Sequence, residues 1–360
     1  MWPDNRILDL FGIEAPILQA PMAGSSGADL ALAVSTAGGL GSLPCALLGP
    51  ERIRAEFGAI RQRTDRPVNL NFFCHVPPAP DAAREAGWRM RLSAYYAEFG
   101  IDPDAAPPGA GRTPFDETGC ALVEELRPQV VSFHFGLPAP ALVERVKKSG
   151  ARVIASATTV AEARWLEERG CDAIIAQGAE AGGHRGIFLS DDVAAQPGTM
   201  ALVPQVVDAV AVPVVAAGGI ADPRGVAAAF MLGAAAVQIG TAYLQCPEAL
   251  TAPVHRAALA AARDDQTVLT NVFTGRPARG LLNRIVREVG PLSAEAPAFP
   301  LAAAAVAPLR GQAEKTGSHD FSPLWAGQAA ALGRAMPAGE LTRDLADGAR
   351  ELLARGARAR

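Results

Sequence analysis

Residues 176–186 bring a glutamine and a histidine together with four glycines, in the order Ala-Gln-Gly-Ala-Glu-Ala-Gly-Gly-His-Arg-Gly. So many glycines disfavour a regular helix, and they allow a backbone to pass close to a flat ligand. Gln177 can hydrogen-bond a polar ring edge, and His184 can accept a proton or donate a hydrogen bond to an anion, because the usual pKa of histidine lies near neutrality. We predict that His184 is catalytic and that Gln177, Gly182 and Gly183 bind a planar cofactor. A turn histidine on the surface is the alternative.

Three other apolar runs end in residues of interest. His134, within Ser-Phe-His-Phe-Gly, is a second candidate catalytic imidazole, with simple packing between the two phenylalanines as the alternative. The run Asn-Leu-Asn ends in an amide that could contact a cofactor, and Gln-Ala-Pro-Met places a stiff proline and a small residue where a planar ring could lie. The residues expected to contact the cofactor here are Ala20, Pro21, Met22 and Asn71, although each could be an ordinary turn residue.

Two glycine turns predict a phosphate site. The first follows the apolar run 214–217 and precedes a helix opened by Asp222, and the second ends the next apolar run. Glycines let backbone N–H groups approach a phosphate, and a helix N-terminus adds a partial positive charge. Because no GxGxxG follows the first apolar run, a dinucleotide fold is not indicated, and a mononucleotide such as FMN fits the single site. The predicted binding residues are Gly218, Gly219, Gln238, Ile239, Gly240 and Thr241, with two simple tight turns as the alternative.

Short apolar runs alternate with helical stretches up to about residue 245, which predicts βα units and a parallel sheet. Eight strands in this order favour a closed (β/α)₈ TIM barrel. Such barrels build their active sites on the loops that follow the strands, which is where the candidate residues above occur. The expected strands are Ile17–Ala20, Leu40–Leu43, Val68–Phe72, Val130–Phe133, Arg152–Ser156, Ala173–Ala176, Val214–Ala217 and Val237–Ile239.

Two stretches interrupt this alternation. Residues 75–115 carry a helical segment, Ala82–Phe99, and a Pro/Gly-rich turn, Pro103–Pro114, and they are expected to form an insertion after the third strand. Residues 251–330 are expected to form a smaller, mainly helical lid or substrate domain over the barrel mouth, where Lys315 could supply a positive charge for substrate binding. The expected organisation is an FMN-binding barrel over 1–250 and 331–360 with this second domain inserted, and with final helices at Ala326–Leu332 and Glu340–Arg355.

Composition excludes several classes of function. The chain has 360 residues, of which 49% are hydrophobic and 19% charged, and a net charge of −4 without a long basic run, which is typical of a globular enzyme and not of a nucleic-acid-binding protein. Five scattered cysteines without CxxC spacing indicate reduced, structural thiols, and no HExxH motif suggests a metal. No GxSxG elbow is present. The first residues lack signal-peptide order and no apolar run reaches ~18 residues, so we expect a cytoplasmic protein without a membrane span.

The segments above resemble those of the class I nitronate monooxygenases, formerly called 2-nitropropane dioxygenases. The resemblance covers nearly the whole chain and includes Ala-Gly-Gly-Leu-Gly at 37–41 and Leu-Trp-Ala-Gly-Gln at 324–328. The Glu-Ala-Gly-Gly-His segment is shared with flavin enoyl reductases, whereas Phe-His-Phe-Gly and Trp-Ala-Gly-Gln narrow the match. Where the family often has Tyr-Pro, this chain has Phe299-Pro300, which puts the substrate range in doubt.

The resemblance implies non-covalent FMN and oxidation of alkyl nitronates, such as propionate 3-nitronate, by O₂ to a carbonyl compound and nitrite, without nicotinamide. It implies His184 as the catalytic residue, and a role in detoxification is one expectation. The alternatives are an FMN-dependent NAD(P)H oxidoreductase acting on enoyl thioesters or quinones, and a non-catalytic flavin-binding protein. We expect a monomer or homodimer whose partners are a small nitronate and O₂. The residues that the resemblance assigns to FMN are Asn71, Gln177, Gly182, Gly219 and Gln238 through Thr241.

Overall fold

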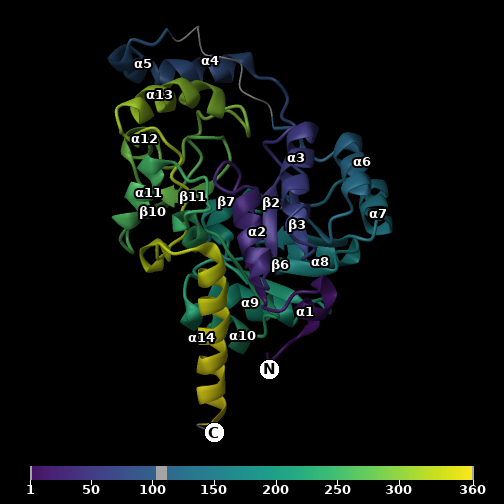
Figure 1. The fold of residues 1–360 in the computed structure, drawn as a ribbon. Helices are drawn as coiled ribbons and strands as arrows, with labels where there is room; N and C mark the ends of the chain where they lie inside the picture. Colours follow the sequence, from purple (N-terminus) through teal and green to yellow (C-terminus); the bar gives the residue numbers. More distant parts are fainter. Residues whose placement is uncertain (1, 103–111, 359–360) are drawn as a thin grey trace.

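A parallel barrel of eight strands forms the larger part of the computed structural model, which describes residues 2–102 and 112–358 (Figure 1). The strand order is β1-β9-β8-β6-β5-β4-β3-β2, and a parallel bridge between Leu18 and Leu40 joins the two ends of this series. The predicted (β/α)₈ barrel is therefore confirmed, and no strand bound differs from its prediction by more than one residue. The strands are β1 (Ile17–Gln19), β2 (Gly41–Pro44), β3 (Val68–Phe73), β4 (Val130–His134), β5 (Arg152–Ala157), β6 (Ala173–Gln177), β8 (Val214–Ala217) and β9 (Ala236–Ile239).

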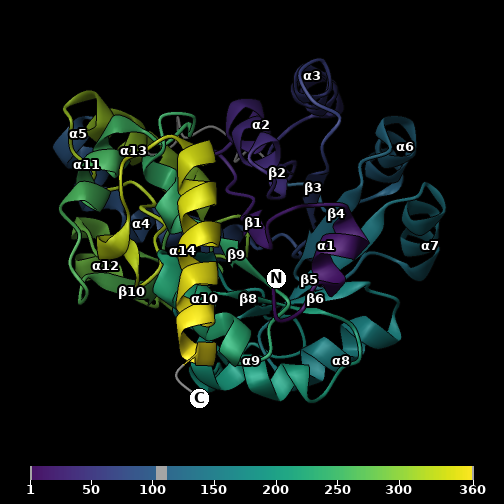
Figure 2. The same ribbon diagram turned by 60° about the horizontal axis from the view of Figure 1, so that its bottom comes forward.

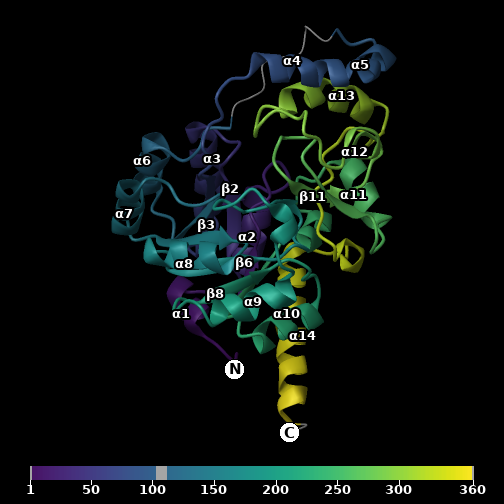
Figure 3. The same ribbon diagram turned by 180° about the vertical axis from the view of Figure 1, so that it is seen from behind.

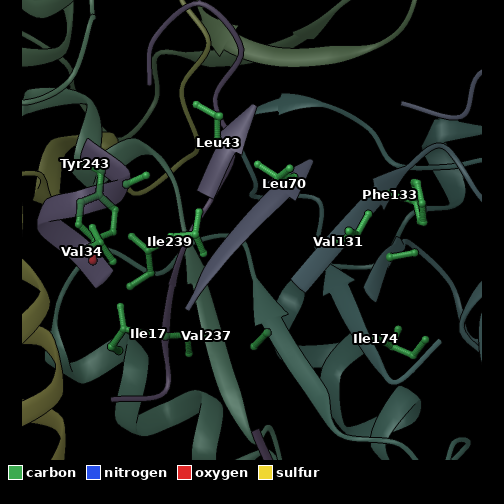
Figure 4. Packing of buried hydrophobic residues seen from close by; sticks show 14 of the residues in the cluster. Ile17, Val34, Leu43, Leu70, Val131, Phe133, Ile174, Val237, Ile239 and Tyr243 are labelled. Carbon is green, nitrogen blue, oxygen red and sulfur yellow. The ribbon is translucent and has the colours of Figure 1, made fainter. Parts of the chain in front are cut away.

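Alternate residues of each strand pack on opposite sides of the barrel wall, as the pleat of a strand requires. Leu18 and Val130 belong to an inner cluster that also contains residues of helix α1 (Arg6–Phe11), which closes the N-terminal end of the barrel (Figure 2). Their neighbours Ile17 and Val131 belong to the cluster beneath the outer helices (Figure 4). The barrel is thus filled at one end by apolar side chains.

The inner side of the barrel changes from apolar to polar toward the carboxyl ends of the strands. Along β6, inward-facing Ile175 is followed two residues later by Gln177, and along β4 Val130 is followed by Ser132 and His134. This change of polarity places hydrogen-bonding side chains at the same end as the loops that follow the strands. The inward-facing polar residues at this end are Asn71, Ser132, His134, Ser156, Gln177 and Gln238.

Helices cover the outside of the barrel. Prolines occupy the first turns of α3, α7 and α10. A backbone N–H in the first turn has no hydrogen-bond acceptor within the helix, so a proline there costs no hydrogen bond. The last helix packs on α10 and α2 and completes the wall, which confirms the helix predicted at Glu340–Arg355 (Figure 2). The covering helices are α2 (Ala28–Thr36), α3 (Pro50–Arg61), α6 (Glu117–Leu126), α7 (Pro140–Lys148), α8 (Val160–Glu168), α9 (Thr199–Val207), α10 (Pro223–Met231) and α14 (Ala338–Arg358).

A second layer stands over the carboxyl ends of the strands and joins two distant stretches of chain (Figures 1 and 3). Trp88 and Tyr96, from the insertion after β3, donate hydrogen bonds to the carbonyls of Ala302 and Ala305. A small antiparallel sheet, β10-β11-β7, lies between these helices and the barrel. The elements are α4 (Ala82–Arg91), α5 (Ser93–Phe99), α11 (Pro253–Ala260), α12 (Arg284–Val289), α13 (Ala303–Lys315), β7 (Gly183–His184), β10 (Thr267–Thr270) and β11 (Ala278–Leu281).

Two sequence predictions of helices need correction. The segment Ala82–Phe99 is two helices that meet at Leu92, and only Ala330–Leu332, a 3₁₀ turn, is helical within Ala326–Leu332. The amides of residues 326–328 instead donate to Arg279 of β11, to the hydroxyl of Thr241 and to Glu180 of the loop after β6, so no helix forms there. Most of the predicted turn Pro103–Pro114 lies outside the described residues. No helix in the described ranges is long and apolar enough to cross a membrane.

Candidate active site

A cavity of about 1350 Å³ opens at the carboxyl ends of the strands, between the barrel and the second layer. Predicted site residues at the ends of six strands line this cavity, and they include both candidate catalytic histidines. The predicted residues that line it are Ala20, Pro21, Met22, Asn71, His134, Gln177, Gly182, Gly183, His184, Gly218, Gly219, Gln238, Gly240 and Thr241.

The two glycine turns present free backbone donors to this cavity. Gly218 and Gly219 adopt φ values of 114° and 70°, which favour glycine. A Cβ on Gly218 would lie 2.8 Å from Oγ1 of Thr199, so the turn has no space for a side chain. The amides of Gly218, Gly219, Gly240 and Thr241 make no hydrogen bond to any described residue. Unpaired backbone amides that converge on one cavity form an anion-binding arrangement, so these four donors suit a phosphate.

Helix α10 adds less to this site than its sequence suggested. The Asp222 carboxylate accepts hydrogen bonds from the amides of Arg224 and Gly225, the first free donors of the helix. This negative cap offsets the partial positive charge that was expected to attract a phosphate. The free amides of the glycine turns therefore carry the anion-binding character.

The loop after β6 is held in shape by the buried side chain of Arg185. Its guanidinium donates to the carbonyls of Gly178 and Gly183, at 3.1 and 3.0 Å, and also to Ala181. Carbonyl oxygens that are drawn toward Arg185 leave the opposite side of this loop free to face the cavity. A Cβ on Gly182 would lie 2.6 Å from the Gly327 nitrogen, so this loop is in close contact with the segment before α14.

His184 lies in the small sheet, where β7 pairs with β11, and it points among aromatic rings. Its ring centroid is 5.3 Å from that of Phe299 and 5.4 Å from that of Trp325. Nε2 is 2.9 Å from the hydroxyl of Thr274, which also contacts the carbonyl of Arg276 at 3.4 Å. Since that carbonyl can only accept, we infer that Thr274 donates to it and accepts from Nε2–H, which leaves the lone pair on Nδ1.

His184 is uncharged at neutral pH. Burial, followed by the positive charge of Arg112 and the nearby His134, lowers its pKa well below the usual value. An unprotonated Nδ1 can accept a proton, but it supplies no positive charge for an anionic substrate. The surroundings of His184 therefore disfavour the charged imidazolium form, which could have bound an anionic nitronate.

His134 and Gln177 both hold the backbone of His184. His134 Nε2 is 3.3 Å and Gln177 Nε2 is 3.1 Å from the carbonyl oxygen of His184, and Gln177 also accepts from the amide of Gly186 at 2.7 Å. Burial and the charge of Arg276 lower the pKa of His134 to about 3. A neutral His134 can donate through Nε2 to His184 while its Nδ1, 3.1 Å from Ser156 Oγ, accepts from that hydroxyl.

Comparison with known proteins places this site in a family. The family model described as nitronate monooxygenase matches residues 4–348. The chain belongs to the nitronate monooxygenase family. A protein from Pseudomonas aeruginosa named nitronate monooxygenase is 44% identical, over 95% of this chain and 98% of its own length, and one from Paraburkholderia phytofirmans with the same name is 42% identical, over 95% and 94%. Like those relatives, the chain is an enzyme, an oxidoreductase.

Solved structures agree with this family membership. Nitroalkane oxidase from Streptomyces ansochromogenes superimposes with a TM-score of 0.88 at 39% identity, over 98% of this chain and 99% of that one. FabK from Thermotoga maritima has a TM-score of 0.74 at 30% identity, with 99% of both chains covered. The shared architecture extends over the whole nitronate monooxygenase fold, including the second layer.

Two residues that the sequence predicts for the site do not line the cavity. Ile239 is 1% exposed and packs in the cluster beneath the outer helices, although its neighbours Gln238 and Gly240 line the cavity. Lys315 ends α13 at an exposed position, where its Nζ is 3.1 Å from Oε1 of Gln312. It is not among the residues that line the cavity.

Sequence reasoning missed four residues of the nitronate monooxygenase site. Arg112, Phe73 and Trp325 line the cavity, and Thr274 contacts His184. Phe73 could have been found from the alternation of inward positions along β3. Arg112 occurs in the insertion and Thr274 in the turn before β11, and no local pattern marks either of them. Trp325 lies in the Leu-Trp-Ala-Gly-Gln segment that carries the family resemblance, but nothing in that segment indicates that its ring lines a cavity. The described chain contains no group of three His, Cys, Asp or Glu residues that could hold a metal ion.

Proposed function

We propose that this enzyme is an FMN-dependent nitronate monooxygenase that oxidises small alkyl nitronates with O₂ to a carbonyl compound and nitrite, without nicotinamide. The proposal rests mainly on one observation: the free amides of the glycine turns and a half-buried, uncharged His184 line the same cavity. We further propose that it acts in the cytoplasm, as a monomer or homodimer. The barrel, 1–250 and 331–360, would hold the cofactor, and residues 251–330 would contribute to the substrate site.

The cavity fits a flavin mononucleotide. Gly218, Gly219, Gly240 and Thr241 offer four amides for one phosphate group, and a single turn pair matches a mononucleotide better than a dinucleotide. The segment Ala20–Met22 and the side chains of Asn71 and Gln177 would lie beside the ring system, and Gly182 and Gly183 would allow its close approach. When bound, FMN supplies the redox chemistry, accepting electrons from the substrate.

The side chains around this space position the substrate and exclude water. His184 presents Nδ1 as a proton acceptor, with its orientation fixed by Thr274 through Nε2. Phe73, Phe299 and Trp325 surround the imidazole with apolar surface, which excludes water from the reacting carbon. Because a nitronate is already ionised, oxidation does not require prior loss of an α-proton.

A second substrate class, neutral nitroalkanes, is favoured by the lone pair on Nδ1. A neutral nitroalkane must lose its α-proton before it can be oxidised, and an uncharged imidazole in an apolar setting can accept that proton. The structural neighbour from Streptomyces ansochromogenes is described as a nitroalkane oxidase. Oxidation of nitroethane should then depend on His184 far more than oxidation of ethylnitronate does.

The decisive test separates the monooxygenase from an FMN-dependent NAD(P)H oxidoreductase, the alternative that the sequence leaves open. Purified protein reconstituted with FMN is mixed anaerobically with NADH or NADPH, and separately in air with propionate 3-nitronate. We expect no bleaching of the flavin by either nucleotide, and stoichiometric nitrite from the nitronate. Rapid bleaching without nitrite release would overturn the proposal, and failure of the protein to bind FMN would remove its basis.

A further inference from the structure

Arg112 brings a guanidinium group into the cavity from the last part of the insertion that follows β3. Its Cζ lies 5.1 Å from the centre of the Phe299 ring, and the residue lines the cavity. Nη1 is buried and makes no hydrogen bond to any described residue. A buried, charged donor without an acceptor is destabilising, so this guanidinium is suited to an acceptor supplied by a ligand, best of all an anionic one.

No carboxylate among the described residues of the cavity lining compensates this charge. The described residues that line the cavity include no Asp or Glu. The other two arginines near the histidines differ from Arg112 in this respect, because Arg185 and Arg276 both donate to backbone carbonyls. Burial lowers the pKa of Arg112, with no acidic neighbour to oppose it, and the guanidinium still stays charged at neutral pH. With both His134 and His184 uncharged, Arg112 is the cation available to a substrate.

The position of Arg112 separates it from the predicted phosphate site. The chain that follows it is tied to β3, because the amide of Phe115 donates to the carbonyl of Phe73 at 2.7 Å. In the barrel order β3 stands four strands from β8, on the opposite side, so the cofactor phosphate and this guanidinium approach from different directions. Both Arg112 and His184 pack near the ring of Phe299. The Cζ atom of Arg112 is 5.1 Å, and the imidazole centroid of His184 is 5.3 Å, from the centroid of that ring.

We propose that Arg112 determines substrate specificity by binding a carboxylate on the nitronate, remote from the carbon that is oxidised. The inference rests on the proposed function and deepens it, because it selects nitronates with a second negative charge. A guanidinium matches the planar geometry of a carboxylate with two parallel hydrogen bonds. Both the guanidinium and the imidazole of His184 line the cavity and pack near the ring of Phe299, so a single bound substrate can reach both groups.

The test compares two nitronates of similar length on four proteins. Propionate 3-nitronate carries the carboxylate, and butyl-1-nitronate replaces it with an ethyl group. The proteins are wild type, Arg112→Met, Arg112→Lys and the control Arg164→Met, which removes an exposed arginine from the outside of α8. We expect Arg112→Met to raise the KM for propionate 3-nitronate about 10- to 100-fold, by loss of a charge-assisted pair, and to change that for butyl-1-nitronate less than about twofold. Arg112→Lys should restore part of the loss, and Arg164→Met should behave as wild type.

A binding measurement without turnover keeps this proposal separate from the proposed function. 3-Nitropropionate, in which the nitro group is not ionised, retains the carboxylate but not the nitronate charge. Its Kd is measured anaerobically by calorimetry on the FMN-loaded proteins. We expect Arg112→Met to weaken this Kd at least tenfold while FMN content and thermal stability stay at wild-type levels. Equal effects on both nitronates, or none on either, would overturn the proposal. Nitronates left unoxidised by wild type, together with Arg112-dependent binding of 3-nitropropionate, would overturn the proposed function and leave the carboxylate site in place.

Discussion

The Nε2 atom of His134 lies 3.3 Å from the carbonyl oxygen of His184, so one of the two candidate catalytic imidazoles holds the backbone of the other. The remaining ring nitrogen of His134 is engaged by Ser156 at 3.1 Å. With both nitrogens occupied within the protein, His134 is better placed to orient the loop of His184 than to exchange a proton with a substrate. Its low pKa, about 3, keeps it in the neutral form that this arrangement requires.

The first prediction concerns this contact. His134→Asn should lower kcat/KM for propionate 3-nitronate about tenfold, the effect of about 1.4 kcal/mol from one lost hydrogen bond. FMN affinity should stay within about twofold of wild type. Ser156→Ala should have a smaller effect, because it leaves the donor to His184 in place. Steady-state kinetics with O₂ held constant measure both variants. A loss above about a thousandfold for His134→Asn would instead assign His134 to the chemistry itself.

The second prediction tests the phosphate site. Gly218→Ala forces a side chain onto a φ of 114° and within 2.8 Å of Thr199 Oγ1. Gly150→Ala is the matched control, because Gly150 has a φ of 98° with nothing within 4 Å and lies after α7, away from the cavity. We expect Gly218→Ala to weaken FMN binding about 10- to 100-fold, measured by quenching of flavin fluorescence. Gly150→Ala should lower only thermal stability. Equal FMN affinity in the two variants would show that FMN does not bind at these turns.

The barrel could be predicted because its signals are local. Each strand is a short apolar run bounded by glycine, proline or polar residues, and the alternation of inner and outer positions follows from the pleat. The same alternation indicates which side of β4 and β6 carries His134 and Gln177. The glycine turns could also be predicted, because a positive φ and a close backbone contact at Gly218 both require that residue.

The second layer could not be predicted in the same way, because it depends on contacts between distant segments. The pairing of β7 with β11, which positions His184, joins residues 183–184 to 278–279, and β7 is too short to leave a sequence pattern. Trp88 reaches Ala302 across more than two hundred residues. The charge of Lys315 and its place in the segment suggest a substrate-binding role, but the residue lies at an exposed position at the end of α13 and does not line the cavity. Arg112 places in the cavity the positive charge that was expected from Lys315, and the residues beside Arg112 in the sequence form no pattern that predicts this.

The third prediction is a loss of stability in mild acid. Burial lowers the pKa of His184 well below 6.5, that of His134 to about 3 and that of His255 to about 4. Below pH 6.5 the unfolded chain therefore binds protons that the folded chain does not, and the free energy of unfolding falls as pH falls. Each fully titrating histidine contributes about 1.4 kcal/mol per pH unit. Urea unfolding at pH 7, 6.5, 6 and 5.5 should show this decrease, and His255→Asn should make it shallower. A constant midpoint over this range would contradict the burial of neutral imidazoles.

The fourth prediction concerns the hydrogen bond between His184 Nε2 and Thr274 Oγ1, at 2.9 Å. Thr274→Val keeps the shape of the side chain but removes the hydroxyl, so Nε2–H loses its acceptor and the imidazole no longer has a fixed tautomer. With nitroethane, which must lose a proton, kcat/KM should fall about 10- to 100-fold, whereas ethylnitronate should lose less than about threefold. Thr274→Ser restores the hydroxyl and should recover most of the nitroethane activity. In wild type, the nitroethane rate should stay level from pH 8 to about 6, because the pKa of His184 lies well below 6.5. Equal losses on both substrates, or no recovery in Thr274→Ser, would show that Thr274 acts on packing and not on the imidazole.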